Sequence, residues 1–397
     1  MNLKRQKIFL SLHEGLRGFR VAGTIWVVLL LVRGFSLTDV GLAEAVFHSV
    51  SFLCEVPSGM LADVLGRRRT LIAAGLTTAV AGAVMAMSTS LPGVCLAMGL
   101  EALGFNLGSG TLEAITYDSL VQAGDPAEYA KWDGRQYACY AAAQALASLG
   151  SFVTVRIGFS GAYAAACCIG LATAFAASRL VEPVVTQAQA SRGRVSLREL
   201  PHRLWDHVRG NLGFLLHRPR LAVKMTCVSF VAACCYLMQM FFQQHVVGAG
   251  LPAALVGLPL FALMMLDMAG ALLGPRMPKR LSALFLVLGL PIAGCIALAG
   301  APGLPLSITA ACLAMLLGTA FAVRAASLLQ PFYPSDSRAT LTSVESMVYS
   351  FCMILLSPAA GGVAGRWGTG ACLAGVGAVL ALMVTALLLY VRKEQTR

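Results

Sequence analysis

The chain has 397 residues, of which 58% are hydrophobic and only 12% are charged. A soluble domain has about 25% charged and about 45–50% apolar residues, so a water-soluble core could not hide this many apolar side chains. The composition therefore excludes a soluble enzyme, a disordered chain and a secreted disulfide-rich module. It indicates a polytopic membrane protein.

Twelve stretches are long enough to span a bilayer, which takes about 20 mainly apolar residues. In chain order they are 9–33, 41–62, 70–90, 93–121, 135–156, 160–181, 219–245, 253–275, 281–300, 303–330, 341–363 and 369–391. The first follows Lys4, Arg5 and Lys7 without a small-residue cleavage site, so we expect a retained span and not a signal peptide. The sequence predicts an all-α protein with twelve transmembrane helices.

The distribution of basic residues predicts the orientation. The net charge is +12, from 30 Lys and Arg against 18 Asp and Glu. The connections after the odd-numbered spans are nearly free of basic residues, whereas both termini and the other connections hold most of them. By the positive-inside rule, both termini and the even-numbered connections are cytoplasmic. The positive charge thus reflects topology, and we expect no nucleic-acid partner.

The longest connection, residues 182–218, separates an N-terminal six-span half (1–181) from a C-terminal one (219–397). It is basic, and Ser196 to Glu199 has capping-box spacing ahead of apolar residues at helical intervals. A basic amphipathic helix on the inner leaflet and a partly ordered basic linker fit this pattern equally well. The 12 cysteines show no CxxC or His-spaced pattern, so we expect packing residues, no metal and no cofactor.

The second and third spans are joined by the stretch Gly59-Met60-Leu61-Ala62-Asp63-Val64-Leu65-Gly66-Arg67-Arg68-Arg69. We expect Gly59 to allow close helix packing and Gly66 to let the backbone reverse. Asp63 should end the second span as a partner for basic groups or helix N-termini. The arginines would anchor the loop to the inner leaflet.

This stretch resembles the signature loop of the major facilitator superfamily, G-x-L-a-D-r-x-G-r-k, although Val64 stands where that family often has Arg. The segments 55–59, 113–120 and 338–340 resemble a bacterial branch of the superfamily. The resemblance implies two pseudo-symmetric six-helix bundles in the bacterial cytoplasmic membrane, a monomer and a small-molecule substrate. It also implies a gating role for Gly59, Asp63, Gly66, Arg67 and Arg68.

An offset of 211 residues carries Gly59 to Gly270 and Arg69 to Arg280, and it also places Glu113 on Arg324. It predicts two parallel repeats related by an axis along the membrane normal. The resemblance implies that the spans holding Glu113 and Arg324 line the central cavity. This acid and this base could then face each other across the substrate path.

Ionisable residues inside spans cost about 2.5–3.5 kcal/mol each to insert, so each is a candidate functional residue. If the first span begins near residue 9, Arg20 faces the cavity and needs an acid, with Glu113 or Glu55 nearest in depth. If the span begins near Phe19, Arg20 belongs to its amphipathic start. Glu55 either lines the cavity or braces the signature loop. Asp118 should pair with a basic residue of the loops, Arg67 among them.

The candidate site therefore has two groups. Proton coupling or cavity charge is assigned to Glu113, Arg324, Arg20 and Glu55. The substrate cavity is assigned to Arg17, Glu101, Asn106, Tyr236, Gln239 and Gln243. Because burial of a carboxylate favours its protonated form, Glu113 could alternate between a proton and an arginine partner.

The leading prediction is a secondary transporter that exports a drug-like or metabolite solute in exchange for protons by alternating access. The alternative is uptake or facilitated diffusion of an organic solute, which two cavity arginines would suit if the solute is an anion. The fifth-span G-P-x-x-G-G pattern of drug antiporters does not occur between Arg135 and Arg156, which weakens the export prediction. A polytopic enzyme is disfavoured because no phosphate-cradling Gly-x-x-x-x-Gly-Lys and no metal-spaced cluster occurs. A membrane sensor that no longer transports is the other alternative.

Overall fold

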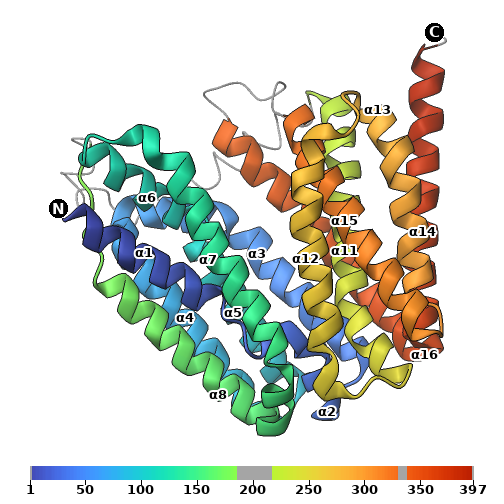
Figure 1. The fold of residues 1–397 in the computed structure, drawn as a ribbon, viewed down its shortest axis with the longest axis horizontal. Coiled ribbons are helices and arrows are strands. Elements are labelled where there is room, and N and C mark those ends of the chain that lie inside the picture. Colours follow the sequence, from blue (N-terminus) through green and yellow to red (C-terminus); the bar gives the residue numbers. More distant parts are fainter. Residues whose placement is uncertain (1, 186–216, 330–337, 396–397) are drawn as a thin grey trace. The chain divides into compact units, whose positions relative to one another are not determined.

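The computed structural model describes residues 2–185, 217–329 and 338–395, and these form helices joined by short connections (Figure 1). The predicted amphipathic helix and most of the predicted linker at 182–218 lie outside the described residues. Among the described residues, ten helical segments are long and apolar enough to cross a membrane by length and composition. The chain is thus a helical multi-pass membrane protein.

Several N-terminal helices are separated or bent at glycines. In chain order the N-terminal elements are α1 (Leu3–Gly18), η1 (Gly23–Ile25), α2 (Trp26–Val32), α3 (Leu37–Leu65), α4 (Arg67–Met87), α5 (Leu91–Gly108), α6 (Thr111–Gln122), η2 (Pro126–Glu128), α7 (Tyr129–Leu149) and α8 (Ser151–Ser178). Gly110 between α5 and α6 and Gly158 inside α8 both have φ of 72°, a conformation that favours glycine. The turn at Gly110 divides the predicted span 93–121 into α5 and α6, and the predicted span 9–33 is divided into α1 and α2 by a non-helical connection after Gly18.

The C-terminal helices are α11 (Pro219–Gly248), η4 (Ala253–Leu255), α12 (Gly257–Leu273), η5 (Gly274–Arg276), α13 (Leu281–Leu284), η6 (Phe285–Gly289), α14 (Leu290–Ala299), α15 (Leu304–Leu329) and α16 (Arg338–Gln395). The η6 segment is π-helical, and Pro291, just after it, has no N–H to donate to the carbonyl four residues earlier. Within α16, Gly368 has φ of 84° and ψ of 164°, so two helices meet there. This break falls in the connection predicted between 363 and 369.

The ten membrane-capable segments differ from the twelve predicted stretches in two places. The segment Ser343–Leu389 contains both of the last two stretches, because α16 runs through the break at Gly368 without an intervening loop. The helix α7, with a run of alanines and a low mean hydropathy, is not among the ten. The other predicted stretches each correspond to a membrane-capable segment.

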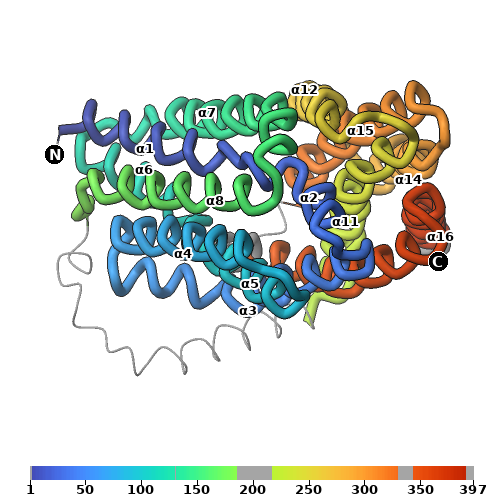
Figure 2. Tube along the Cα trace, turned by 90° about the horizontal axis from the view of Figure 1, so that it is seen from below, coloured from blue at the N-terminus to red at the C-terminus, as the bar shows by residue number. Residues whose placement is uncertain are grey.

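Two compact units form by contact: unit 1 comprises Met1–Thr24 and Val46–Gly210, and unit 2 comprises Ile25–Ala45 and Asn211–Arg397. In unit 1, α4 packs along α8 and α5, and α1 packs along α7 and α8 (Figures 1 and 2). In unit 2, α11 and α14 pack along α16, and α12 packs along α15 (Figure 1). The helix α2 and the first residues of α3 belong to unit 2.

Small residues bring these helices close together. A Cβ atom at Gly75 of α4 would lie 2.6 Å from the backbone nitrogen of Ala174 in α8, and one at Gly170 of α8 would lie 2.6 Å from the nitrogen of Ala79. In unit 2, a Cβ atom at Gly377 of α16 would lie 2.5 Å from the carbonyl oxygen of Ala293 in α14. Such contacts are typical of helix packing in membranes, where van der Waals packing drives association.

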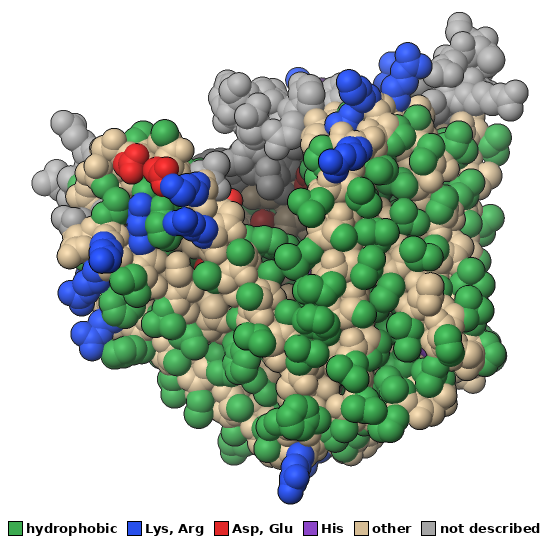
Figure 3. Space-filling model, viewed as in Figure 1, with side chains coloured by type: hydrophobic (Ala, Val, Ile, Leu, Met, Phe, Trp, Pro, Cys, Tyr) green, Lys and Arg blue, Asp and Glu red, His purple; other side chains and the backbone are tan. Residues whose placement is uncertain are grey.

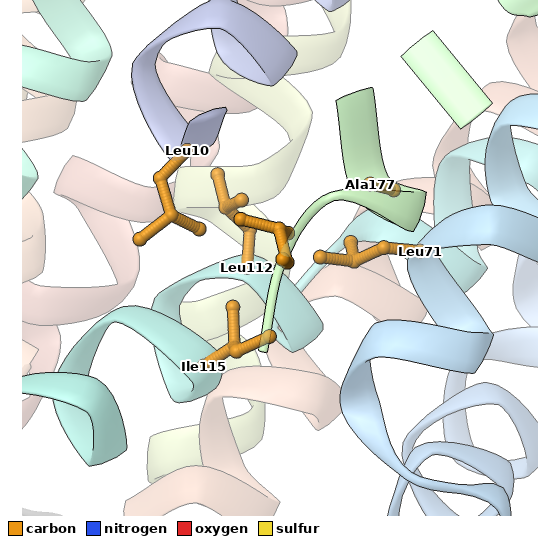
Figure 4. Close-up of a cluster of buried hydrophobic side chains, with 6 residues drawn as sticks. Leu10, Leu71, Leu112, Ile115 and Ala177 are labelled. Carbon is orange, nitrogen blue, oxygen red and sulfur yellow. The ribbon is translucent and has the colours of Figure 1, made fainter. Parts of the chain in front are cut away.

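A small apolar core closes one end of unit 1. Leu10 of α1, Leu71 of α4, Leu112 and Ile115 of α6 and Ala177 of α8 point toward one another in Figure 4. The space-filling view shows hydrophobic side chains along the flanks of the helices, and Lys and Arg side chains gathered near the helix ends of unit 1 (Figure 3). The core therefore lies beneath a charged helix end, where the signature loop is also found.

Candidate functional site

An ion pair sits at the break in the first membrane segment. Arg20 lies in the connection between α1 and η1, and its Nη2 is 3.4 Å from Oε1 of Glu101 in α5. Tyr163 of α8 is buried and interacts electrostatically with both charges. The acid facing Arg20 is thus Glu101, whereas the sequence had put forward Glu113 or Glu55. Packing of α5 against α4, which sequence depth does not reveal, helps to bring Glu101 to this position.

A second charged group occupies the inward face of α1. Gln6, Leu10, His13, Glu14 and Gly18 are the buried residues of this helix, and they recur at helical spacing. Nε of Arg17 is 2.7 Å from Oε1 of Glu14, and its guanidinium lies 5.2 Å from the centre of the Tyr140 ring in α7. The residues before Phe19 are therefore a packed helix of unit 1 and not an amphipathic segment lying outside it.

The remaining N-terminal candidates lie on α3, α5 and α6. Asn106 is 1% exposed, and its amide donates to the carbonyl of Ser51 at 2.7 Å and accepts from the Ser51 hydroxyl at 2.9 Å. Glu113 is exposed in the first turn of α6, where a carboxylate is favoured by the helix dipole. Glu55 is half-buried in the middle of α3. Asn106 thus joins α3 to α5; Glu55 lies further along α3, and Glu113 lies on α6.

The signature loop is held by a carboxylate that the sequence did not indicate. Gly66 has φ of 94°, and the backbone N–H groups of Arg67 and Arg68 donate to the two carboxylate oxygens of Glu182 at 2.9 and 2.7 Å. Glu182 follows α8 and thus caps the start of α4. The sequence places Glu182 in the predicted linker 182–218. The signal that could have identified it as a helix cap is its position as a single acid between the end of the preceding helix and Pro183.

The loop arginines turn toward the protein. Arg67 forms an ion pair with Asp118 of α6 and donates to the carbonyl of Ala114 at 2.7 Å. Arg68 donates to the carbonyl of Ser178 at the end of α8 at 2.6 Å. The expected pairing of Asp118 with a loop arginine is confirmed. The expectation that all the arginines anchor the loop to lipid is wrong for Arg67 and Arg68, because their guanidinium groups bind α6 and α8.

Two other expectations for this loop need correction. A Cβ atom at Gly59 would have no described atom within 4 Å, so this glycine does not serve close helix packing among the described residues. Asp63 is exposed near the end of α3, and the helix N-terminus that follows is capped by Glu182 in its place. Close packing occurs instead at Gly270, the equivalent of Gly59 by offset, where a Cβ atom would lie 2.3 Å from the carbonyl oxygen of Leu316.

In unit 2, the candidate residues of α11 share one helix face. Tyr236, Gln239 and Gln243 stand at intervals of three and four residues, and the Oε1 atom of the buried Gln243 has no hydrogen-bond partner among the described residues. Arg324 of α15 is half-buried, and its Nε donates to the carbonyl of Pro278 at 3.0 Å. On the neighbouring α12, Asp267 accepts a hydrogen bond from Thr319 of α15.

The described residues include no group of three or more His, Cys, Asp or Glu side chains that could hold a metal ion. All 12 cysteines are free thiols. The polar side chains that lie between the helices form ion pairs and amide hydrogen bonds. In a membrane, such groups recognise or exclude a polar solute.

Comparison with known proteins defines the family. The sequence profile of the Major Facilitator Superfamily matches residues 18–331, and the chain belongs to this superfamily of transporters. A search of curated protein sequences found no match. The match includes the signature loop and both halves of the predicted repeat.

Solved structures show the same fold. The crystal structure of the nucleoside transporter NupG has a TM-score of 0.76 at 14% identity and covers 97% of this chain and 98% of its own. A D-xylose–proton symporter gives a TM-score of 0.70 at 13% identity, with 97% of each chain covered. The human organic anion transporter MFSD10 gives 0.60 at 16% identity, with 98% of this chain and 100% of its own covered. At these identities the likeness shows the fold, and the fold is that of membrane transporters.

Proposed function

We propose that the chain has twelve transmembrane helices, with α7 and the two parts of α16 each crossing the bilayer. They form two pseudo-symmetric bundles, 1–181 and 219–397, joined by the linker 182–218. Equivalent helix pairs support this arrangement. In unit 1, α4 packs along α8, and in unit 2, α14 packs along α16; the offset of 211 residues carries the first pair onto the second.

Its function, on this proposal, is secondary active transport of a small organic solute across the bacterial cytoplasmic membrane by alternating access. It acts as a monomer with both termini in the cytoplasm, and it exports solute in exchange for protons. The observation that carries the proton coupling is the pair of Arg20 and Glu101 at the break between α1 and α2. Neither charge is stable alone in a bilayer, so Glu101 stays ionised while Arg20 faces it and takes a proton when Arg20 leaves.

The pair would link proton binding to movement because Arg20 lies in a non-helical connection. Such a connection can change its backbone angles while the helices on either side keep theirs. Protonation of Glu101 removes the attraction that holds Arg20 against α5. The helix α2 then becomes free to move relative to α1, which is the kind of change that alternating access requires.

The other candidates keep their proposed roles around this pair. Glu113 and Arg324 would line the transport path, supported by their equivalence in the repeat. The face of α11 with Tyr236, Gln239 and Gln243 would contact the solute, and Gln243 has an amide oxygen to offer. Asp63 and the loop 59–68 would favour one orientation of the bundles, so we expect Asp63→Asn to slow turnover without preventing insertion.

A second candidate function is uptake or facilitated diffusion of an organic anion. The observation in its favour is Arg324, whose Nε donates to a carbonyl and whose guanidinium forms no ion pair within the described part of the chain. Arg17 and Arg20 already face Glu14 and Glu101, so Arg324 is the cation available to an anionic solute. On this reading, anionic compounds compete for transport and an imposed proton gradient has no effect.

The test is transport by the full-length protein in proteoliposomes with an imposed proton gradient, using cationic, neutral and anionic compounds. We expect one compound to move protons in the opposite direction, and we expect Glu101→Gln to abolish that coupling while the compound still binds. Glu128→Gln, which removes an exposed carboxylate, is the matched control and should behave as wild type. Proton-coupled transport that survives Glu101→Gln would refute the role of Glu101.

A further inference from the structure

Where α1 and α7 begin, a tryptophan is surrounded by cations. The Nζ atom of Lys7 lies 4.3 Å from the ring centre of Trp132, and the guanidinium carbon of Arg135 lies 5.1 Å from it. Both distances are within cation–π range. Lys7 belongs to α1, and Trp132 and Arg135 belong to α7. The Trp132 indole therefore contacts one cation from the start of α1 and one from the start of α7.

The indole N–H of Trp132 is buried and has no acceptor among the described residues. The Trp132 side chain lines a small groove together with Thr116, Ser119 and Gln136, whose polar groups are satisfied. Thr116 and Gln136 hydrogen-bond to each other at 3.1 Å, and Ser119 accepts from Gln6 and donates to a backbone carbonyl. An unpaired donor beside two cations is a binding site for an acceptor that carries negative charge.

The charge around the groove is positive. The helix starts at 3–10 and 128–136 hold five basic and two acidic side chains. Of these, Lys131 hydrogen-bonds Glu128 at 2.8 Å and holds the pKa of that exposed carboxyl below its usual value. Lys7 and Arg135 also act on Glu128 but more weakly, because the hydrogen bond of that carboxylate goes to Lys131; Lys7 and Arg135 are therefore the cations next to Trp132 that can meet an incoming anion.

A different face of α1 from the one that lines the groove is basic at its start and apolar after it. Lys4, Ile8 and Leu12 stand four residues apart on one face of α1, and Ile8 and Leu12 are 57% and 45% exposed. A basic helix end followed by apolar side chains matches the order of an anionic headgroup and its acyl chain. Tryptophan is also enriched at this depth, where its ring is apolar and its N–H is polar.

We propose that Lys7, Trp132 and Arg135 bind the headgroup phosphate of an anionic phospholipid. The indole N–H donates to a phosphate oxygen, the two cations neutralise its charge, and the acyl chain lies along the exposed face of α1. By the proposed orientation, this lipid comes from the inner leaflet, where anionic headgroups meet basic protein segments. The site is separate from the solute path, so it stands or falls independently of the solute and of proton coupling.

The experiment measures lipid binding to the purified full-length protein in a neutral detergent. Phosphatidylglycerol and phosphatidylcholine are titrated separately, and bound lipid is counted by native mass spectrometry. One basic residue near an anionic headgroup contributes about fivefold in affinity, so we expect Lys7→Gln/Arg135→Gln to weaken phosphatidylglycerol binding about 25-fold. Trp132→Phe keeps the ring and removes the N–H, and we expect about a tenfold loss. Phosphatidylcholine binding should change little.

Matched variants make the result specific. Arg276→Gln/Lys279→Gln removes two positive charges from unit 2, and Trp367→Phe removes an exposed indole there; both should keep wild-type lipid binding. An equal loss in either control, or unchanged binding in the Lys7→Gln/Arg135→Gln variant, would overturn the proposal. Displacement of the lipid by millimolar inorganic phosphate would overturn it as well, because it would reveal a site for a free anion.

Discussion

Glu182 caps the helix that Arg67 begins: the carboxylate, placed just after α8, accepts the backbone N–H of Arg67 at 2.9 Å. Its second oxygen accepts the N–H of Arg68 at 2.7 Å. Arg68 in turn donates to the carbonyl of Ser178 at the end of α8. The start of α4 and the end of α8, two helices that pack along each other in unit 1, are therefore tied by hydrogen bonds at this end.

We expect Glu182→Ala to destabilise the protein by about 1–2 kcal/mol, because two N–H groups of α4 lose their acceptor and the helix dipole loses its counter-charge. Glu182→Gln keeps one acceptor and should cost less. The measurement is the thermal unfolding midpoint of the purified protein in detergent. Glu128→Gln is the control, since that carboxylate is exposed. An unchanged midpoint in Glu182→Ala would show that water caps α4 equally well.

The pair of Arg67 and Asp118 predicts strong coupling between two mutations. The two side chains are 15% and 10% exposed, so removal of one partner leaves a largely buried charge. We expect about 3 kcal/mol of destabilisation from either Arg67→Gln or Asp118→Asn. The double variant should be more stable than the sum of the two losses implies. A double-mutant cycle on the unfolding midpoint measures this, and strictly additive losses would contradict the coupling.

The membrane helices could be predicted because their signal is local. Length and apolar content in one stretch are sufficient for most of them. The pairing of Asp118 with Arg67 was also within reach, because few acids lie near the signature loop and each needs a partner. In the same way, the glycine at 66 was expected to reverse the chain, and its φ of 94° shows why.

The helix breaks and the partners of most buried charges could not be predicted. The chain has 40 glycines, and nothing in the sequence marks Gly110 and Gly158 as those with positive φ. Glu101 and Arg20 are 81 residues apart in the sequence and meet through the packing of α5 in unit 1. Depth in the membrane alone did not distinguish Glu101 from Glu113. Glu182 lay in a stretch that composition assigned to the linker, although it folds back onto α4.

Gly59 and Gly270, which the offset of 211 residues aligns in the sequence, predict different responses to one substitution. Gly270→Ala would place a Cβ atom 2.3 Å from the carbonyl oxygen of Leu316, so α12 must move away from α15. We expect a loss of about 1–3 kcal/mol, as for other overpacked sites. Gly59→Ala meets open space in a helix and should be neutral or stabilising by up to about 1 kcal/mol. Unfolding midpoints of both variants, with expression level as a second readout, test the pair. Equal losses would refute the difference in packing.

The ion pair of Arg20 and Glu101 makes a prediction that needs no knowledge of the solute. Arg20→Gln leaves the Glu101 carboxylate in the membrane without its counter-charge. Because the two side chains are 41% and 30% exposed, we expect a moderate loss of about 1–2 kcal/mol and not the full cost of a buried charge. Arg20→Gln/Glu101→Gln replaces the ion pair with two amides and should recover most of that loss. Arg33→Gln, which lies beyond the end of α2, is a matched control for the removal of one arginine. Unfolding midpoints in detergent test whether the two charges compensate each other. If the double variant is less stable than Arg20→Gln alone, they do not. Arg20 is then held by other groups around the break.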